Sequence, residues 1–158
     1  MATAAAPTPD GAARPPGIRD AAGIQATLDA AAAAFRSGDA EALEPLLASP
    51  GSAFGARWLD RARNMATLPL DHYELRLDDA LPDLSTQRVR DAHAGEVQVV
   101  YVVEELALAG FDPQPAAEDL FLTVVDDGDG WRIATDVDAE PLGFVSVDHL
   151  WDLSLIHI

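Results

Sequence analysis

Acidic side chains are the residues of this chain whose types and spacing suit them to chemistry. Asp136 and Asp138 stand two residues apart near the C-terminal end, and Glu104 and Glu105 end a long apolar run. Burial among apolar side chains disfavours the charged form of a carboxyl group and raises its pKa toward neutral pH. A carboxylate in such a place could therefore accept a proton from a bound molecule.

Asp136 is the acid that we would test first, and its surroundings leave two interpretations open. Alternation along its predicted strand puts it on the side opposite to Trp131, Ile133 and Val137, which indicates a solvent-facing position. A solvent-facing carboxylate would have no unusual reactivity, so the sequence assigns no catalytic residue and favours a chain that is not an enzyme as it stands.

The histidines of this chain do not have the spacing of metal ligands on a helix. The histidines are scattered, and none has a carboxylate at the i, i+4 spacing of a zinc helix; they are His72, His93, His149 and His157. The run Asp126–Gly130 is acidic but lacks the 12-residue calcium loop with a terminal glutamate. We expect no metal and no cofactor.

Five aromatic residues could line a small cavity, because their apolar rings and polar tips suit an apolar ligand. They are Trp58, Tyr73, Tyr101, Phe121 and Trp131. The same residues could equally be ordinary core, so a ligand pocket and a filled core both remain open.

Composition excludes several classes of partner. The chain has 158 residues, 27 of them acidic and 10 basic, a formal net charge of −17 and no cysteine. Such a charge repels phosphate backbones and anionic lipid, so we expect neither nucleic-acid nor membrane-surface binding. No apolar run approaches the roughly 20 residues that span a bilayer.

The first half of the chain has the spacing of helices. Asp20 can cap a helix that ends at Gly38, Asp39 can cap a second one that contains or breaks at Pro45, and Ser52 can cap a third. On the third helix, apolar and basic residues share one face: Phe54, Trp58, Arg61 and Met65.

The second half changes to the alternating spacing of strands. Residues 72–78 alternate, residues 87–92 could be a short polar strand, and residues 96–107 are apolar on both faces, which predicts a central strand. The glycines and aspartates of Asp126–Gly130 predict a tight hairpin. Helices followed by four to six antiparallel strands predict an α+β fold, with the helices on one face of a curved sheet.

Part of this pattern resembles the nuclear transport factor 2-like (SnoaL-like) superfamily. The resemblance covers residues 18–138 and rests on Phe35-Arg36-Ser37-Gly38-Asp39 at the end of the first helix and on Trp131-Arg132-Ile133 in the last hairpin. It implies a cone-shaped, cystatin-like half-barrel with a pocket on its concave face. It also implies two kinds of member: enzymes such as isomerases and cyclases, here with Asp136 as the base and Tyr73 or Tyr101 as hydrogen-bond donor, and non-catalytic scaffolds.

A narrower resemblance lies at the C-terminal end. Residues 131–138 followed by Asp148-His149-Leu150-Trp151-Asp152 are similar to a group of actinobacterial exported proteins, in which such a domain precedes a gluzincin peptidase-like domain. That resemblance implies an extracellular or cell-surface location, although the first 17 residues do not have the pattern of a signal peptide.

The domain organisation that we predict has four parts. Residues 1–17 are a Pro/Ala-rich leader, 18–140 the folded domain, 141–152 the start of a linker, and 153–158 the translation of a sequencing adapter. The predicted function is a non-catalytic accessory or ligand-binding domain of a larger exported protein, cut before its C-terminal domain. Its partner would be a small apolar ligand or its own downstream domain. The alternatives are a small isomerase or cyclase and a homodimerising scaffold.

Overall fold

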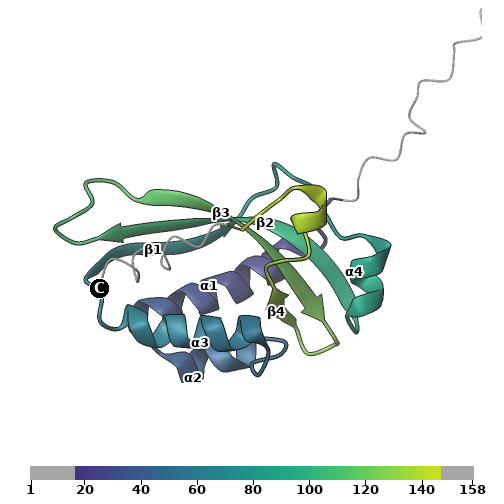
Figure 1. Ribbon diagram of the computed structural model, residues 1–158, viewed down its shortest axis with the longest axis horizontal. Coiled ribbons are helices and arrows are strands. Elements are labelled where there is room, and N and C mark those ends of the chain that lie inside the picture. Colours follow the sequence, from purple (N-terminus) through teal and green to yellow (C-terminus); the bar gives the residue numbers. More distant parts are fainter. Residues whose placement is uncertain (1–16, 147–158) are drawn as a thin grey trace, which may run out of the picture.

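The computed structural model describes residues 17–146 as an α+β fold, in which helices pack on one four-stranded antiparallel sheet (Figure 1). This confirms the predicted fold class. The predicted leader up to residue 16, and the linker and adapter from residue 147 on, lie outside the described residues.

Three helical segments precede the sheet and lie together on one side of it (Figure 1). They are α1 (Ala21–Ser37), α2 (Ala40–Leu43) with the 3₁₀ turn η1 (Glu44–Leu46), and α3 (Ala53–Met65). Their predicted caps are present: Asp39 accepts a hydrogen bond from the backbone of Ala42, and Ser52 from that of Gly55. Pro45 lies inside η1, where the α-helical hydrogen bonding of α2 gives way to the tighter turn. No helix among residues 17–146 is long and apolar enough to cross a bilayer.

The sheet follows the chain order β1-β2-β3-β4. Its strands are β1 (Leu70–Leu77), β2 (Glu96–Leu108), β3 (Ala116–Asp126) and β4 (Trp131–Thr135). The predicted central strand is β2, which pairs with β1 and β3, and the predicted tight hairpin joins β3 to β4. Gly128 and Gly130 have φ of 112° and 105°, a backbone conformation that glycine adopts without strain.

Two local predictions are wrong. Residues 87–92 form a helix, α4 (Gln87–Ala92), because Thr86 caps it by accepting a hydrogen bond from the backbone of Val89, whose side chain is buried. The last strand ends at Thr135, so Val137 lies beyond it with its side chain exposed. The chain continues instead into a 3₁₀ turn, η2 (Glu140–Leu142).

The start of α1 is fastened to the far end of the sheet. Asp20 has φ of 50° and accepts two hydrogen bonds, from the backbone N–H of Gly23 at 3.2 Å and from the indole Nε1 of Trp131 at 2.8 Å. Next to it, the backbone N–H of Arg19 donates to the amide oxygen of Gln98, a fully buried residue of β2. One carboxylate therefore serves as a helix cap and as the polar partner of a buried aromatic residue.

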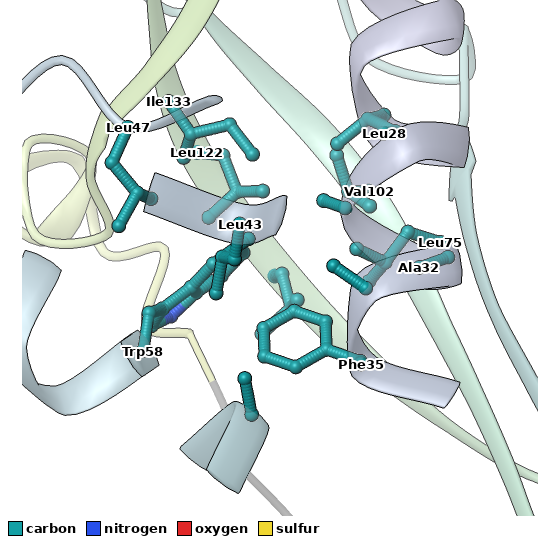
Figure 2. Packing of buried hydrophobic residues seen from close by; sticks show 14 of the residues in the cluster. Leu28, Ala32, Phe35, Leu43, Leu47, Trp58, Leu75, Val102, Leu122 and Ile133 are labelled. Carbon is teal, nitrogen blue, oxygen red and sulfur yellow. The ribbon is translucent and has the colours of Figure 1, made fainter. Parts of the chain in front are cut away.

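The main core fills the space between the helices and the inner face of the sheet. Trp58 packs edge-on against Phe35 with ring centroids 5.2 Å apart, and Figure 2 shows both rings at the centre of the cluster between α1, α3 and the strands. Leu122 and Ile133 contribute from β3 and β4. Burial of these large side chains supplies most of the hydrophobic stabilisation of the fold.

A second, smaller cluster lies on the outer face of the sheet. Its buried members come from α4, β2, β3 and the segment after β4: Val89, Val97, Val99, Phe121 and Ala139. Because alternate residues of a strand point to opposite faces, β2 and β3 can contribute to both clusters. The outer face is thus apolar where α4 and residues 139–144 cover it.

Candidate functional site

The most unusual feature among the described residues is an ion pair inside the main core. The guanidinium of Arg61 on α3 pairs with the carboxylate of Glu104 on β2, and their side chains are only 2% and 1% exposed. Arginine and glutamate are almost never fully buried unless they are paired. A buried charged pair on the helix-covered side of the sheet is therefore our candidate functional site.

Aromatic rings surround this pair. The guanidinium carbon of Arg61 lies 5.1 Å from the ring centroid of Phe35 and 5.9 Å from that of Tyr73, and one of its nitrogens donates to the Tyr73 hydroxyl at 3.4 Å. Rings at these distances attract a cation through the negative charge of their faces. The site thus combines a cation, an anion and a hydroxyl in an apolar enclosure.

Ordinary local rules bring these side chains together. Arg61 lies one turn from Trp58 and Met65 on the buried face of α3, and Glu104 shares the inner face of β2 with Val102 and Leu106. Tyr73 comes from β1 on the same side. Three elements that pack for hydrophobic reasons therefore carry the polar groups into one place.

A second carboxylate lies close to the pair in the sheet register. Glu118 of β3 is the direct cross-strand partner of Glu104, so both side chains stand on the inner face. Glu118 is only partly buried, whereas Glu104 is fully so. The inner face therefore becomes more accessible from Glu104 toward Glu118.

The buried ion pair does not necessarily make the folded state more stable than apolar side chains in its place would. Two charges lose their hydration on burial, and their mutual attraction often does no more than offset that loss. Hydrophobic residues of the same size would commonly serve stability as well. The pair therefore calls for an explanation other than stability, such as conformational specificity or recognition.

Asp136, the predicted catalytic candidate, lies elsewhere. It follows β4 and its carboxylate forms an ion pair with Arg57 of α3, whose guanidinium also lies 5.6 Å from the ring centroid of Phe54. This arrangement ties the segment after β4 to α3. It does not bring Asp136 to the Arg61–Glu104 pair.

The five predicted pocket residues divide between the two faces of the sheet. Trp58, Tyr73 and Trp131 belong to the main core, whereas Tyr101 and Phe121 belong to the outer cluster, where their rings stack at 5.4 Å. The structure does not bring the five together around one cavity. Of the five, Tyr73 is the residue that contacts Arg61 of the candidate site.

Tyr101 has an altered acidity on the outer face. Its hydroxyl donates a hydrogen bond to the carboxylate of Asp119 at 2.6 Å, and this bond together with desolvation and the nearby negative charge raises the pKa of Tyr101 to about 12. At neutral pH Tyr101 is therefore a firmly protonated hydrogen-bond donor.

Also on the outer face, a polar chain links three segments. One carboxylate oxygen of Asp138 lies 3.0 Å from Nε2 of His93 and accepts a hydrogen bond from the Thr123 hydroxyl at 2.7 Å. This contact fastens the segment after β4 and the residue after α4 to β3. The carboxylate stands between the other two groups, so His93 does not contact the hydroxyl as the base of a nucleophilic triad would.

Comparisons with protein-family models, with curated proteins and with solved structures found no match to this chain. The site must accordingly be interpreted from its own geometry.

The ion pair itself was missed by the sequence analysis, which placed Arg61 on a helix face and Glu104 at a strand end without joining them. A charged residue at a core position in each of two elements was the available signal. Their partnership depends on how α3 crosses the sheet, which periodicity does not specify.

Proposed function

We propose that this chain is a non-catalytic accessory domain of a larger exported protein, acting through contact with a partner. The observation that carries the proposal is that its interior is occupied by its own side chains. Trp58, Phe35 and Met65 fill the space above the inner face, and the Arg61–Glu104 pair completes it. On the superfamily resemblance, this is the face on which an enzyme would hold its substrate.

The buried carboxylate also fits this proposal better than a catalytic one. A general base must reach the proton that it removes and must be free to bind it. Glu104 is already paired with the cation of Arg61 and is 1% exposed. The inner face thus supports a fixed structure rather than turnover.

An exposed apolar surface near the end of the described chain supports contact with a partner. Val137, Leu142 and Val145 are 46%, 47% and 57% exposed, within a segment of nine residues. We call these three residues the C-terminal patch. Exposed apolar side chains that lie so close together in the sequence can contribute to an interaction surface. We propose the protein's own downstream domain as the partner, since the patch lies within the last ten residues that the structure describes.

The gene gives the first test. Sequencing the source locus across the codon for Asp152 should reveal an open frame that continues into a further domain. A stop codon near position 158 would contradict the accessory role.

A dye-binding experiment tests the filled interior. The fluorescence of 1-anilinonaphthalene-8-sulfonate would be titrated against the wild-type chain and against the triple variant Val137→Ser, Leu142→Ser, Val145→Ser. We expect the saturable signal of the wild type to weaken in the triple variant, because Val137, Leu142 and Val145 are exposed apolar side chains to which the dye can bind. Phe111 is exposed as well, so an undiminished signal that also survives Phe111→Ser would reveal an open interior pocket.

That second result would favour a small enzyme of the isomerase or cyclase kind. One observation supports this alternative: Glu104 and the Tyr73 hydroxyl are placed around the same guanidinium, as an acid and a hydrogen-bond donor near a substrate would be. Glu104→Gln should then abolish turnover of any substrate found, in a variant that circular dichroism shows to be still folded.

A further inference from the structure

The outer face of the sheet carries a group of three side chains with the donor types of a metal site. They are His72 and Glu74 of β1 and Glu105 of β2, and each offers one ligand atom such that all three atoms lie within 4.8 Å of one another. Among the described residues this is the one group of three or more histidine and acidic side chains so arranged. We propose that this group binds a divalent transition-metal cation, with Zn²⁺ as the best fit.

The donor separations match a small tetrahedral ion. Zn²⁺ binds imidazole nitrogen and carboxylate oxygen at about 2.0–2.2 Å, so two ligands of a tetrahedral site lie roughly 3.4 Å apart. Nε2 of His72 lies 3.1 Å from Oε2 of Glu105 and 3.6 Å from Oε2 of Glu74. Both separations fall close to the tetrahedral edge without rearrangement of the backbone.

The sheet register gives an independent reason for a cation. Glu74 and Glu105 are direct cross-strand partners. Like charges in such positions repel each other and destabilise a sheet, and the whole chain already carries a formal charge of −17. A bound divalent cation would remove this repulsion between Glu74 and Glu105.

The surroundings leave the group open to an ion. The side chains of His72, Glu74 and Glu105 are 36%, 47% and 28% exposed. A groove of about 310 Å³ adjoins the edge of β1 and is lined in part by His72, Glu74 and Asp71. Three protein ligands and an accessible fourth position are the arrangement of zinc sites that keep an exchangeable ligand.

Imidazole together with carboxylate favours zinc over calcium or magnesium. Ca²⁺ and Mg²⁺ take six or more oxygen ligands and have little affinity for nitrogen, whereas imidazole suits Zn²⁺, Ni²⁺ and Cu²⁺. The same donor set would hold Co²⁺ in tetrahedral geometry, which gives a spectroscopic probe. We expected no metal from the sequence because no histidine has a carboxylate at the i, i+4 spacing of a helix. This group instead combines the i, i+2 spacing of a strand with a residue of the neighbouring strand.

The test is a titration of the full 158-residue chain, purified free of metal, with Zn²⁺ by calorimetry and with Co²⁺ by visible absorption. We expect one Zn²⁺ ion to bind saturably. Bound Co²⁺ should give the visible absorption bands of tetrahedral coordination. His72→Gln and Glu105→Gln should each weaken binding by about tenfold or more, which corresponds to 1.4 kcal/mol.

Two matched variants separate this site from general attraction to an acidic protein. Glu41→Gln removes the same charge from α2, on the other side of the sheet, and His93→Gln removes an imidazole at the other end of the outer face. Both should bind Zn²⁺ as the wild type does.

Three results would overturn the proposal. They are the absence of saturable binding, equal binding by the wild type and His72→Gln, and an affinity for Zn²⁺ that falls as much in Glu41→Gln as in Glu105→Gln. The first would leave the contact between His72 and Glu105 as an ordinary hydrogen bond.

Discussion

Glu104 and Glu105 are neighbours on β2 with the same side chain, and the fold gives them opposite surroundings. Glu104 points inward, is 1% exposed and pairs with Arg61 among aromatic rings. Glu105 points outward, keeps 28% of its side chain exposed and lies beside His72 and Glu74. Their difference follows from the two-residue repeat of a strand, which alternates the side chains between the faces.

The role of a polar group in this fold therefore depends on the face of the sheet that it occupies. At the buried position of Glu104 on the inner face a charge needs a partner inside the core, since water cannot reach it. On the outer face, water, a proton or a metal ion can each be the partner of a charged side chain. We therefore expect changes at Glu104 to affect stability and changes at Glu105 to affect binding.

The largest expected effect is from Glu104→Gln, which leaves the guanidinium of Arg61 in the core without its carboxylate. Breaking a buried ion pair from one side costs about 3–5 kcal/mol. Urea unfolding would measure the loss, with Glu105→Gln in metal-free buffer as the control at about 0.5 kcal/mol or less. Equal effects at the two positions would refute the contrast between the faces.

Replacing both members of the pair should recover the loss. Arg61→Met combined with Glu104→Met substitutes apolar side chains of similar length, and such exchanges are often neutral or stabilising by about 1–4 kcal/mol relative to the wild type. Urea unfolding of the single and double variants gives the coupling energy. A double variant as unstable as Glu104→Gln would indicate that a further group, such as Glu118, depends on Arg61.

Zinc should stabilise the protein through the outer face alone. At a free Zn²⁺ concentration 100 times the dissociation constant, an ion that binds only the folded state adds about 2.7 kcal/mol to the free energy of unfolding. Urea unfolding with and without Zn²⁺ should reveal this gain in the wild type and a smaller one in Glu105→Gln. A gain of equal size in both would place the ion elsewhere.

The smallest effect concerns Tyr101, also on the outer face. Its folded-state pKa of about 12 lies above the ordinary value of 10.0, so the stabilisation from its hydrogen bond to Asp119 is complete below pH 10 and decreases as pH rises toward 12. Tyr101→Phe should lose about 0.5 kcal/mol at neutral pH, the lower end for a hydrogen bond.

The acidity of Tyr101 can be followed by the ultraviolet absorption of tyrosinate. The wild type should have a transition near pH 12 that Tyr101→Phe lacks. A transition near pH 10 assigned to Tyr101 would mean that the bond to Asp119 does not form in solution.

Periodicity was sufficient to predict most of the fold. Residues 96–107 had apolar side chains on both faces, and the structure places them in the interior strand β2 with a cluster on each side. The glycines of Asp126–Gly130 identified the hairpin, since its backbone needs positive φ. The segment 87–92 is too short and polar for periodicity to separate a helix from a strand, and the cap at Thr86 is the local feature that decides for the helix.

The site was harder to predict because its parts are joined only by packing. Arg61 and Glu104 come from different elements, and no local rule specifies that α3 brings one onto the other. Two members of the proposed metal-binding group could be predicted from the sequence, because His72 and Glu74 are two residues apart on one face of a strand. Glu105 joins them only through the β1–β2 register, which the sequence does not specify.

The two hydrogen bonds that Asp20 accepts can form only at different times during synthesis of the chain. Its carboxylate caps α1 and receives the indole of Trp131, which follows 111 residues later in the chain. Chains are made from the N-terminus, and contacts of such long separation form late. The first helix therefore leaves the ribosome without its last partner, and the hydrogen bond from the indole of Trp131 to Asp20 waits until β4 has been translated.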